Sequence, residues 1–259
     1  MTLPFDPLTR ADEVERLVMK GLSRKYYRFR PARYYGGIAT ADQSGCCFLC
    51  AYCWNHERNL HPEKSGGGYY SPDQVAGRLL NIARVKDFNK VRLSGAEPIL
   101  GERSFEHFRQ VLEEVSRANP WLDFVLETNG ILFGCHPEFC VALTGFKRLQ
   151  VRVSLKGWDE DSFERISGAQ GRFFEIPLKG LRHLLENGVT AWPALMYDVF
   201  CREGIEVIIQ RLNQLGIKAE ELELEYLEPY PFVLENLKRR SVLEPFEGGT
   251  DRTPSNAAS

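Results

Sequence analysis

Long hydrophobic runs are absent from this sequence of 259 residues. Neither the segment from Met1 to Leu22 nor any later one is apolar over the length that a secretory signal or a membrane-spanning helix requires. This absence predicts a protein without a membrane anchor, located in the cytoplasm. The sequence also shows no internal repeat.

An excess of charge of either sign is absent too. The 33 lysines and arginines nearly balance the 35 aspartates and glutamates, which leaves a formal net charge of -2. No overall electrostatic field therefore favours nucleic acid or an anionic membrane as a partner. The length suits one large domain or two small ones, and either can bury an ample core.

Cysteine is scarce outside one short segment. Four of the seven cysteines fall within GCCFLCAYCWN, Gly45 to Asn55, whereas Cys135, Cys140 and Cys201 are scattered at no metal-like spacing. In a reducing compartment, closely spaced cysteines indicate metal binding or catalysis more often than a disulfide. We interpret the three scattered cysteines as buried thiols.

Apolar, β-branched runs alternate with helical patterns along the chain. The predicted strands are Ile38–Ala41, Val91–Leu93, Phe124–Leu126, Leu149–Val153, Ala191–Met196 and Leu222–Leu227. Apolar side chains recur at helical spacing after Ser71-Pro72-Asp73, between Phe105 and Val115, between Leu178 and Leu185, and between Ile205 and Leu215. This alternation predicts an α/β fold of about six parallel strands joined by right-handed crossovers. Either a doubly wound sheet or a barrel short of eight strands would satisfy it.

Three regions follow from this pattern. Residues 1–35 contain a predicted helix, Asp12 to Leu22, and a basic and aromatic lead-in, RKYYRFRPARYY. Residues 36–231 form the α/β core, and residues 232–259 form a C-terminal segment with a polar tail that we expect to be disordered. The lead-in interleaves cations with rings, as single-stranded RNA sites do. We favour the other interpretation, in which it is a solvated edge segment that uses its arginine stems and tyrosines for packing.

Polar, glycine or proline residues follow nearly every predicted strand. The segments are the cysteine loop, SGAEP (94–98), ETNG (127–130), SLKG (154–157), MYD (196–198) and LEPYP (227–231). Parallel α/β folds carry their chemistry at the carboxyl ends of the strands. We therefore expect these segments to face one shared pocket.

The cysteine loop itself allows three interpretations. Cys46, Cys50 and Cys53 have the spacing C-x3-C-x2-C, and three thiolates can hold three corners of an iron–sulfur cubane while one iron stays open. His56 could instead complete a tetrahedral zinc site with them. A redox dithiol of Cys47 and Cys50 is the third interpretation, although it gives the flanking cysteines no role.

The loop resembles the motif C-x3-C-x-aromatic-C of the radical S-adenosylmethionine (SAM) superfamily, and the resemblance extends from about Gly36 to Pro231. It implies a partial (β/α)6 TIM-like barrel that is open on one side. It also implies one 4Fe-4S cluster on Cys46, Cys50 and Cys53, which would reductively cleave SAM to a 5′-deoxyadenosyl radical that abstracts a hydrogen atom. The electron would come from a flavodoxin or ferredoxin. Cys47 has no role in the motif.

The same resemblance assigns SAM-binding residues. Main-chain groups of SGAEP would face the methionine amine, and Tyr52 would lie against the adenine. Glu127 and Ser154 would reach the ribose, and Lys156 would pair with the carboxylate of SAM. The full set of expected SAM contacts is Tyr52, Ser94, Gly95, Ala96, Glu97, Glu127, Ser154, Lys156 and Tyr230.

The substrate stays open. ETNG and SLKG are most similar to segments of glycyl-radical activating enzymes, whereas CAYCWN resembles the wybutosine-type enzymes that modify tRNA. A barrel of about six strands leaves a side opening, and the sequence offers little to cover it. We therefore predict a macromolecular substrate, a protein or RNA segment. A zinc-stabilised binding module without catalysis is the alternative of another class.

Overall fold

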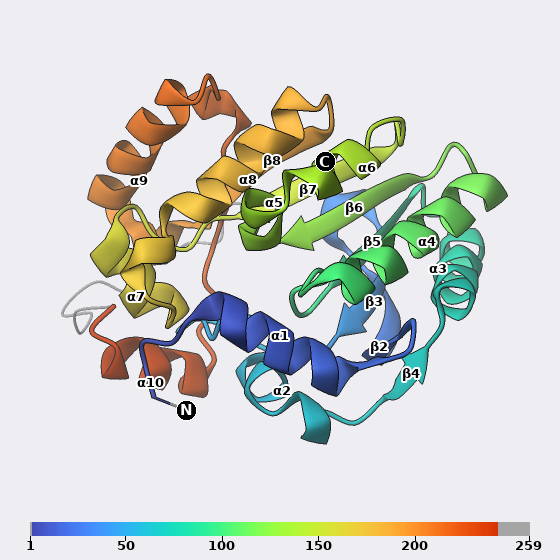
Figure 1. The fold of residues 1–259 in the computed structure, drawn as a ribbon, viewed down its shortest axis with the longest axis horizontal. Coiled ribbons are helices and arrows are strands. Elements are labelled where there is room, and N and C mark those ends of the chain that lie inside the picture. Colours follow the sequence, from blue (N-terminus) through green and yellow to red (C-terminus); the bar gives the residue numbers. More distant parts are fainter. Residues whose placement is uncertain (1, 243–259) are drawn as a thin grey trace.

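The predicted strands assemble into one twisted, mostly parallel sheet, which Figure 1 shows in a computed structural model that describes residues 2–242. The strands are β1 (Met19–Lys20), β2 (Ser23–Ala32), β3 (Ile38–Gln43), β4 (Gly68–Tyr70), β5 (Lys90–Ser94), β6 (Asp123–Thr128), β7 (Leu149–Ser154), β8 (Thr190–Met196) and β9 (Glu223–Glu225). The polar tail predicted to be disordered lies outside the described residues.

Helices connect the strands and cover one face of the sheet. They are α1 (Pro7–Val18), α2 (His56–Leu60), α3 (Pro72–Lys86), α4 (Glu102–Ala118), α5 (Ile131–Cys135), α6 (Pro137–Ala142), α7 (Glu160–Ser167), α8 (Glu175–Glu186), α9 (Tyr197–Gln214) and α10 (Pro231–Arg239). Short 3-10 helices lie at Tyr34–Gly36, Pro62–Lys64, Gly171–Phe173 and Ala219–Glu221. Within residues 2–242, none of the helices is both long enough and apolar enough to cross a bilayer.

The sheet is an open barrel rather than a closed one. Its order is β1-β2-β3-β5-β6-β7-β8-β9, with β4 paired to β2, and the six strands from β3 to β9 on this path run parallel. The six predicted strands are those six, so the partial TIM-like barrel is confirmed. The open side lies between β9 at one end and the antiparallel strands at the other.

Capping residues set the helix bounds. The α3 prediction is confirmed, because Pro72 opens the helix and the Gln74 side chain accepts a hydrogen bond from the N–H of Ser71 at 3.1 Å. The first helix differs from its expected range. It begins earlier, because the Asp6 carboxylate caps it by accepting from the N–H groups of Leu8 and Thr9. It ends earlier, because Met19–Lys20 pairs with β2.

The basic and aromatic lead-in differs most from its expectation. Residues 24–32 belong to β2, which pairs with β3 antiparallel and so extends the sheet beyond the predicted core. Arg24, Lys25 and Tyr26 are buried, and the Tyr26 ring stacks on Phe29 with centroids 5.5 Å apart. The segment is therefore a structural strand of the same sheet.

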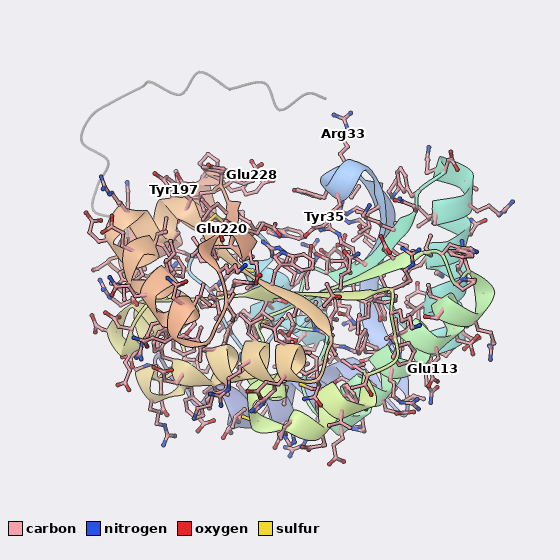
Figure 2. All side chains as sticks on the ribbon, turned by 90° about the horizontal axis from the view of Figure 1, so that it is seen from above. Arg33, Tyr35, Glu113, Tyr197, Glu220 and Glu228 are labelled. Carbon is pink, nitrogen blue, oxygen red and sulfur yellow. The ribbon has the colours of Figure 1, made fainter. Side chains whose placement is uncertain are left out.

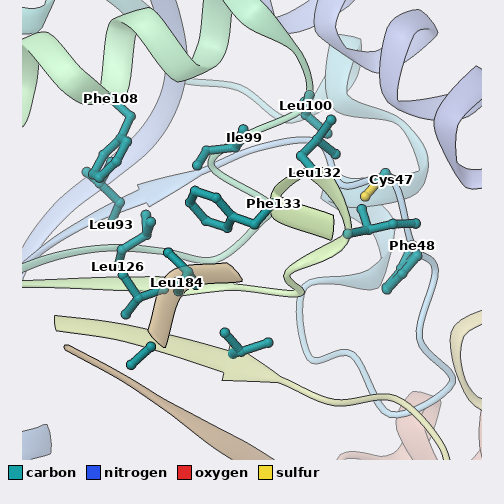
Figure 3. Close-up of a cluster of buried hydrophobic side chains, with 14 of the residues drawn as sticks. Cys47, Phe48, Leu93, Ile99, Leu100, Phe108, Leu126, Leu132, Phe133 and Leu184 are labelled. Carbon is teal, nitrogen blue, oxygen red and sulfur yellow. The ribbon is translucent and has the colours of Figure 1, made fainter. Parts of the chain in front are cut away.

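The two faces of the parallel sheet differ in chemistry. On the helix-covered face, Leu93, Phe108, Leu126 and Phe133 pack together in the main core (Figure 3). The opposite face, called the inner face below, carries Arg92 and, in register with it on β3, Thr40, which accepts a hydrogen bond from Arg92 Nε at 3.0 Å. The residue in register on β6 is Val125, which belongs to a second, smaller apolar cluster. Strand alternation thus separates the main apolar core from a face that also carries charged side chains.

Candidate active site

The cysteine loop follows β3 and is fixed by its backbone, independently of its thiols. The N–H groups of Leu49 and Ala51 donate to the carbonyls of Ser167 and Ile166 at the end of α7, at 2.9 and 2.8 Å. From α1, Arg10 Nε donates to the carbonyl of Cys46 at 3.1 Å. The loop is therefore held from two sides.

The surroundings of the three motif cysteines fit thiolate ligands of an iron–sulfur cluster. The N–H of Phe48 donates to Cys46 Sγ at 3.4 Å, and Asn59 Nδ2 donates to Cys53 Sγ at 3.5 Å. Burial raises the pKa of Cys50 to about 12, although the nearby cations Lys156 and Arg240 favour its thiolate form and lower the pKa in part. Hydrogen-bond donors and cations next to sulfur stabilise the negative charge that such a cluster carries.

Cys47 lies outside this set. Its side chain is buried in the core beside Leu100 and Leu132 (Figure 3), and it accepts a hydrogen bond from Asn129 Nδ2 at 3.1 Å. Its thiol also hydrogen-bonds Cys46, the first of several causes that lower the pKa of Cys46 to about 7. For Cys47 to act as a redox dithiol with Cys50, its buried side chain would have to leave the hydrophobic core.

A single-ion site is not formed around His56. Within residues 2–242, no three His, Cys, Asp or Glu side chains are arranged to hold one metal ion. Zinc needs such convergence of its ligands, whereas each iron of a cubane takes one cysteine from the protein. The structure therefore gives the zinc interpretation no support in the part it describes.

The turn after β5 is tied to the cysteine loop. Gly95 has φ +85°, and its carbonyl accepts from Asn55 Nδ2 at 2.6 Å and from Asn59 Nδ2 at 3.3 Å. A Cβ at this position would lie 3.2 Å from the carbonyl oxygen of Gln43, so glycine suits both the conformation and the space. Ala96, the next residue, is half-buried.

Glu97 serves as a brace within the site. Its buried carboxylate accepts from Thr128 Oγ1 and the N–H of Asn129, both at 2.7 Å, and from the N–H of Ile99 at 3.2 Å. Burial, assisted by the charge of Cys46, raises the pKa of Glu97 to about 8. The side chain thus joins the SGAEP and ETNG turns instead of facing outward, and only its main chain remains a candidate SAM contact.

Glu127, the acidic residue of ETNG, lies on the inner face, where ion-pair and hydrogen-bond partners surround its carboxylate. Glu127 forms an ion pair with Arg92 at 2.5 Å and accepts from Ser94 Oγ at 2.6 Å. Burial opposes its ionisation, but Arg92 and Arg152 hold the pKa of Glu127 below its ordinary value. A carboxylate has about four acceptor positions, so Glu127 can still accept hydroxyl donors such as those of a ribose.

The SLKG segment brings Lys156 to the cysteine loop. Lys156 Nζ donates to Tyr52 Oη at 2.9 Å and lies 5.2 Å from the centroid of the Tyr52 ring. Burial lowers the pKa of Lys156, but Tyr52 and Cys50 raise it more, so the amine stays charged. Ser154 accepts a hydrogen bond from Arg152 Nη1 at 2.9 Å.

Tyr230 lies apart from the other predicted residues. It precedes α10, is 47% exposed, and stacks on Phe232 with centroids 5.8 Å apart. Within residues 2–242, no hydrogen bond or ring contact joins it to the residues around the cysteine loop. Its role toward SAM stays a prediction.

Sequence reasoning missed the polar side chains that support the site. They are Arg10, Arg24, Asn55, Asn59, Arg92, Asn129 and Arg152. Two of them had a signal, because an arginine between apolar residues in VRL and VRV should be buried in a parallel strand and must meet a carboxylate. The asparagines are placed by tertiary contacts that local sequence does not specify.

Replacing Asn59 by alanine should lower the reduction potential of the cluster that the resemblance implies. A hydrogen bond donated to a ligand sulfur favours the reduced, more negative state, so its loss disfavours reduction. We expect up to about tenfold in the reduction equilibrium, or about 59 mV for one electron, measured by redox titration with electron paramagnetic resonance. Asn129→Ala removes a donor to Cys47 and should leave the potential unchanged; equal shifts in both variants would contradict the assignment.

Comparisons with known proteins agree with this site. The sequence model of the radical SAM superfamily matches residues 41–215. The chain is 28% identical over 195 residues to the probable GTP 3′,8-cyclase of Methanosarcina acetivorans, covering 75% of this chain and 51% of that protein. It is 29% identical over 133 residues to the GTP 3′,8-cyclase of Microcystis aeruginosa, covering 49% and 36%. The chain thus spans about half the length of these relatives or less.

Solved structures share the fold. Streptococcus suis SuiB bound to the precursor peptide SuiA superimposes with a TM-score of 0.58 and 15% identity, over 79% of this chain and 44% of that one. Native anSMEcpe with bound SAM gives 0.52 and 17% identity, over 76% and 55%. At these identities the likeness concerns the fold. The family match and the geometry of the cysteine loop together show that this chain belongs to the radical SAM superfamily, whose members use a 4Fe-4S cluster and SAM.

Proposed function

We propose that this radical SAM enzyme abstracts a hydrogen atom from a peptide segment of a macromolecular substrate. Cys46, Cys50 and Cys53 would hold the cluster, and the turns after β5, β6 and β7 would hold SAM. The bound cluster and SAM supply a 5′-deoxyadenosyl radical, and the chain's own residues orient SAM and exclude water from it.

The main support for this proposal is that the charged side chains on the inner face are already paired with one another. Each of the arginines that β2, β5 and β7 place there already has a carboxylate partner in the described structure: Arg28 and Arg30 with Asp42, Arg92 with Glu127, and Arg152 with Glu223 and Glu225. A nucleoside triphosphate would need unpaired cations, and using these would take the ion-pair partners from the buried Asp42 and from the partly exposed Glu127, Glu223 and Glu225. A substrate of mixed charge, such as a peptide, could bind without breaking these ion pairs.

The flanks of the open side suit a polypeptide as well. In Figure 2, Arg33 and Tyr35 lie on one flank, and Tyr197 and Glu228 lie on the facing one. Tyr197 and Tyr226 are 41% and 66% exposed, and their ring centroids are 5.6 Å apart. Exposed aromatic side chains beside charges of both signs are typical of protein interfaces.

RNA is a weaker candidate than the lead-in suggested. Of the four arginines in the lead-in, Arg24 is buried and Arg28 and Arg30 are paired with Asp42, which leaves Arg33 exposed; one exposed arginine does not form a row of free cations for phosphates. The relatives named above are cyclases, and they lend no support to the nearer likeness to activating or tRNA-modifying enzymes. SuiB, which shares the fold, is described as bound to a precursor peptide.

GTP is the second candidate substrate, because the curated relatives are named GTP 3′,8-cyclases. The experiment that separates the two uses anaerobically reconstituted enzyme, SAM and dithionite. 5′-Deoxyadenosine release is measured with GTP alone and with a pool of peptides from the host proteome. We expect peptides to increase the release at least about tenfold over the substrate-free rate and GTP to leave it unchanged. Stimulation by GTP alone would overturn the proposal in favour of the cyclase reaction.

The compartment and the electron source complete the proposal. None of the seven cysteines, all of which lie within residues 2–242, is paired in a disulfide, which fits the reducing cytoplasm. We propose an external one-electron donor of the flavodoxin or ferredoxin type, because the cysteines outside the loop, Cys135, Cys140 and Cys201, lie at no spacing that would hold a second cluster.

A further inference from the structure

One buried arginine of α1 connects the first and the third of the motif cysteines. Arg10 is 4% exposed and lies outside residues 41–215, the part of the chain that the superfamily model matches. Its Nε donates to the carbonyl of Cys46 at 3.1 Å, and its Nη2 donates to the carbonyl of Asn59 at 2.7 Å. The side chain of Asn59 donates in turn to Cys53 Sγ at 3.5 Å. A single side chain therefore holds Cys46 directly and Cys53 through Asn59.

Asn59 passes this contact on to the rest of the site. Its Oδ1 accepts from the N–H of Gly45 at 3.1 Å, and its Nδ2 also donates to the carbonyl of Gly95 at 3.3 Å. Gly45 precedes the first motif cysteine, and Gly95 belongs to the turn after β5. Arg10 fixes the main chain from which this buried asparagine reaches both segments.

Packing and main-chain bonds fix α1 itself against the loop. Gly45 has φ +88°, and a Cβ at this position would lie 2.6 Å from Val14 Cγ1 and 2.9 Å from Val18 Cγ1, so glycine allows the helix to approach closely. Before the helix begins, the N–H of Phe5 donates to the carbonyl of Gly168, directly after α7, at 3.2 Å. The helix is therefore held at both of its ends next to the cysteine loop.

The charge of Arg10 acts on the same loop. Burial lowers the pKa of Arg10, and the charges of Cys46, Cys47 and Glu13 oppose this effect. A guanidinium keeps its proton even so. Glu13 is exposed, so water and salt screen its charge more than that of the buried groups. A buried positive charge beside an iron–sulfur cluster stabilises the reduced state, which is the more negative one.

We propose that Arg10 is a positioning residue of the iron–sulfur site, which aligns Cys46 and Cys53 and whose charge raises the reduction potential of the cluster. The proposal rests on the cluster that the proposed function places on the motif cysteines, and it is independent of the substrate. It makes α1, which precedes the predicted core, a component of the site.

The test is the reduction potential of the reconstituted cluster, measured by redox titration with electron paramagnetic resonance. Arg10→Gln keeps a hydrogen-bond donor and removes the charge, so it should lower the reduction equilibrium constant at least about tenfold, or about 59 mV for one electron. Arg10→Lys keeps the charge and should stay within about threefold of the parent. A merely structural role would shift both variants alike, because neither side chain has the fork that donates to both carbonyls.

Arg16 provides the matched control, because it lies on the exposed side of the same helix. Arg16→Gln makes the same change of charge and should leave the potential unchanged. Equal potentials in Arg10→Gln and Arg16→Gln, or equal shifts in Arg10→Gln and Arg10→Lys, would overturn the proposal. If Arg10→Gln takes up little iron, the iron content decides: Arg10→Lys should then load as the parent does, and poor loading of both would overturn the role of the charge. Failure of the parent to take up a cluster would count instead against the proposed function.

Discussion

Cys50→Ala should abolish the 4Fe-4S cluster and, with it, all formation of 5′-deoxyadenosine. Two thiolates are left when any one of Cys46, Cys50 and Cys53 is removed, and two do not hold a cubane that normally takes three. The fold should survive, because main-chain bonds from Leu49 and Ala51 hold the loop without the thiols. Iron and sulfide content and the visible spectrum after anaerobic reconstitution measure the loss, with a thermal melt as the check on folding.

Cys47→Ala is the matched control for this series. It removes the fourth cysteine of the same loop, but that side chain belongs to the hydrophobic core. We expect the cluster to remain, with a loss of stability of about 1 kcal/mol or slightly more from the small cavity. A full cluster spectrum in Cys50→Ala, or its absence in Cys47→Ala, would show that the ligands have been assigned wrongly.

Much of the fold followed from sequence because its signals are local. Parallel strands that are packed on their helix-covered face read as short apolar runs, and all six such runs became strands of the path from β3 to β9. Helix α3 followed from its proline and its capping residues. These features depend on neighbours within a few positions, so periodicity and capping suffice to find them.

The antiparallel edge did not follow, because its signal is not local. RKYYRFRPARYY contains so many cations that it suggests a solvated segment. The structure resolves this with a β-bulge: the register of β2 against β3 shifts between Tyr26 and Arg28, so Tyr26 faces the core while Arg28 and Arg30 turn to the inner face and share the carboxylate of Asp42. The partner carboxylate is 12 residues or more away along the chain and belongs to the next strand. Sequence alone does not reveal such a pairing.

In the candidate site, too, the features with a local sequence signal could be predicted and those set by distant contacts could not. The cysteines and the strand-end segments could be predicted, because each is a contiguous motif. What each side chain contacts could not. Glu97 and Glu127 both belong to segments near the end of a predicted strand, yet one braces two turns inside the protein and the other lies on the inner face. Glu127 is still part of β6 and follows the alternation of that strand, whereas Glu97 lies in the turn after β5, which has no sequence period from which to read the direction of its side chain.

The resemblance predicts that Lys156 is the cation that pairs with the carboxylate of SAM. Lys156 comes from the turn after β7 and reaches the cysteine loop, where its amine bonds the hydroxyl of Tyr52. The phenol is a neutral partner in its ordinary state, so the positive charge is not neutralised there. Burial lowers the pKa of Lys156, but Tyr52, Cys50 and Glu225 together keep it above its ordinary value. A charged amine is thus held next to the predicted ligands Cys50 and Cys53.

Lys156→Met should weaken SAM binding about 10- to 150-fold, because it removes one charge-assisted hydrogen bond, worth about 1.5–3 kcal/mol, while keeping the length of the side chain. Isothermal titration calorimetry on the reconstituted protein measures the change, and an unaltered iron content shows that the cluster is intact. Tyr52→Phe is the control, since it deletes the neutral partner of Lys156 and leaves the charge, so binding should fall less than about fivefold. Glu127→Gln is less informative, because it leaves the buried Arg92 without its ion-pair partner and should lower the melting temperature as well. If Lys156→Met bound SAM as tightly as the parent, the assignment of the SLKG segment to the SAM carboxylate would be wrong, whatever the cysteine variants showed.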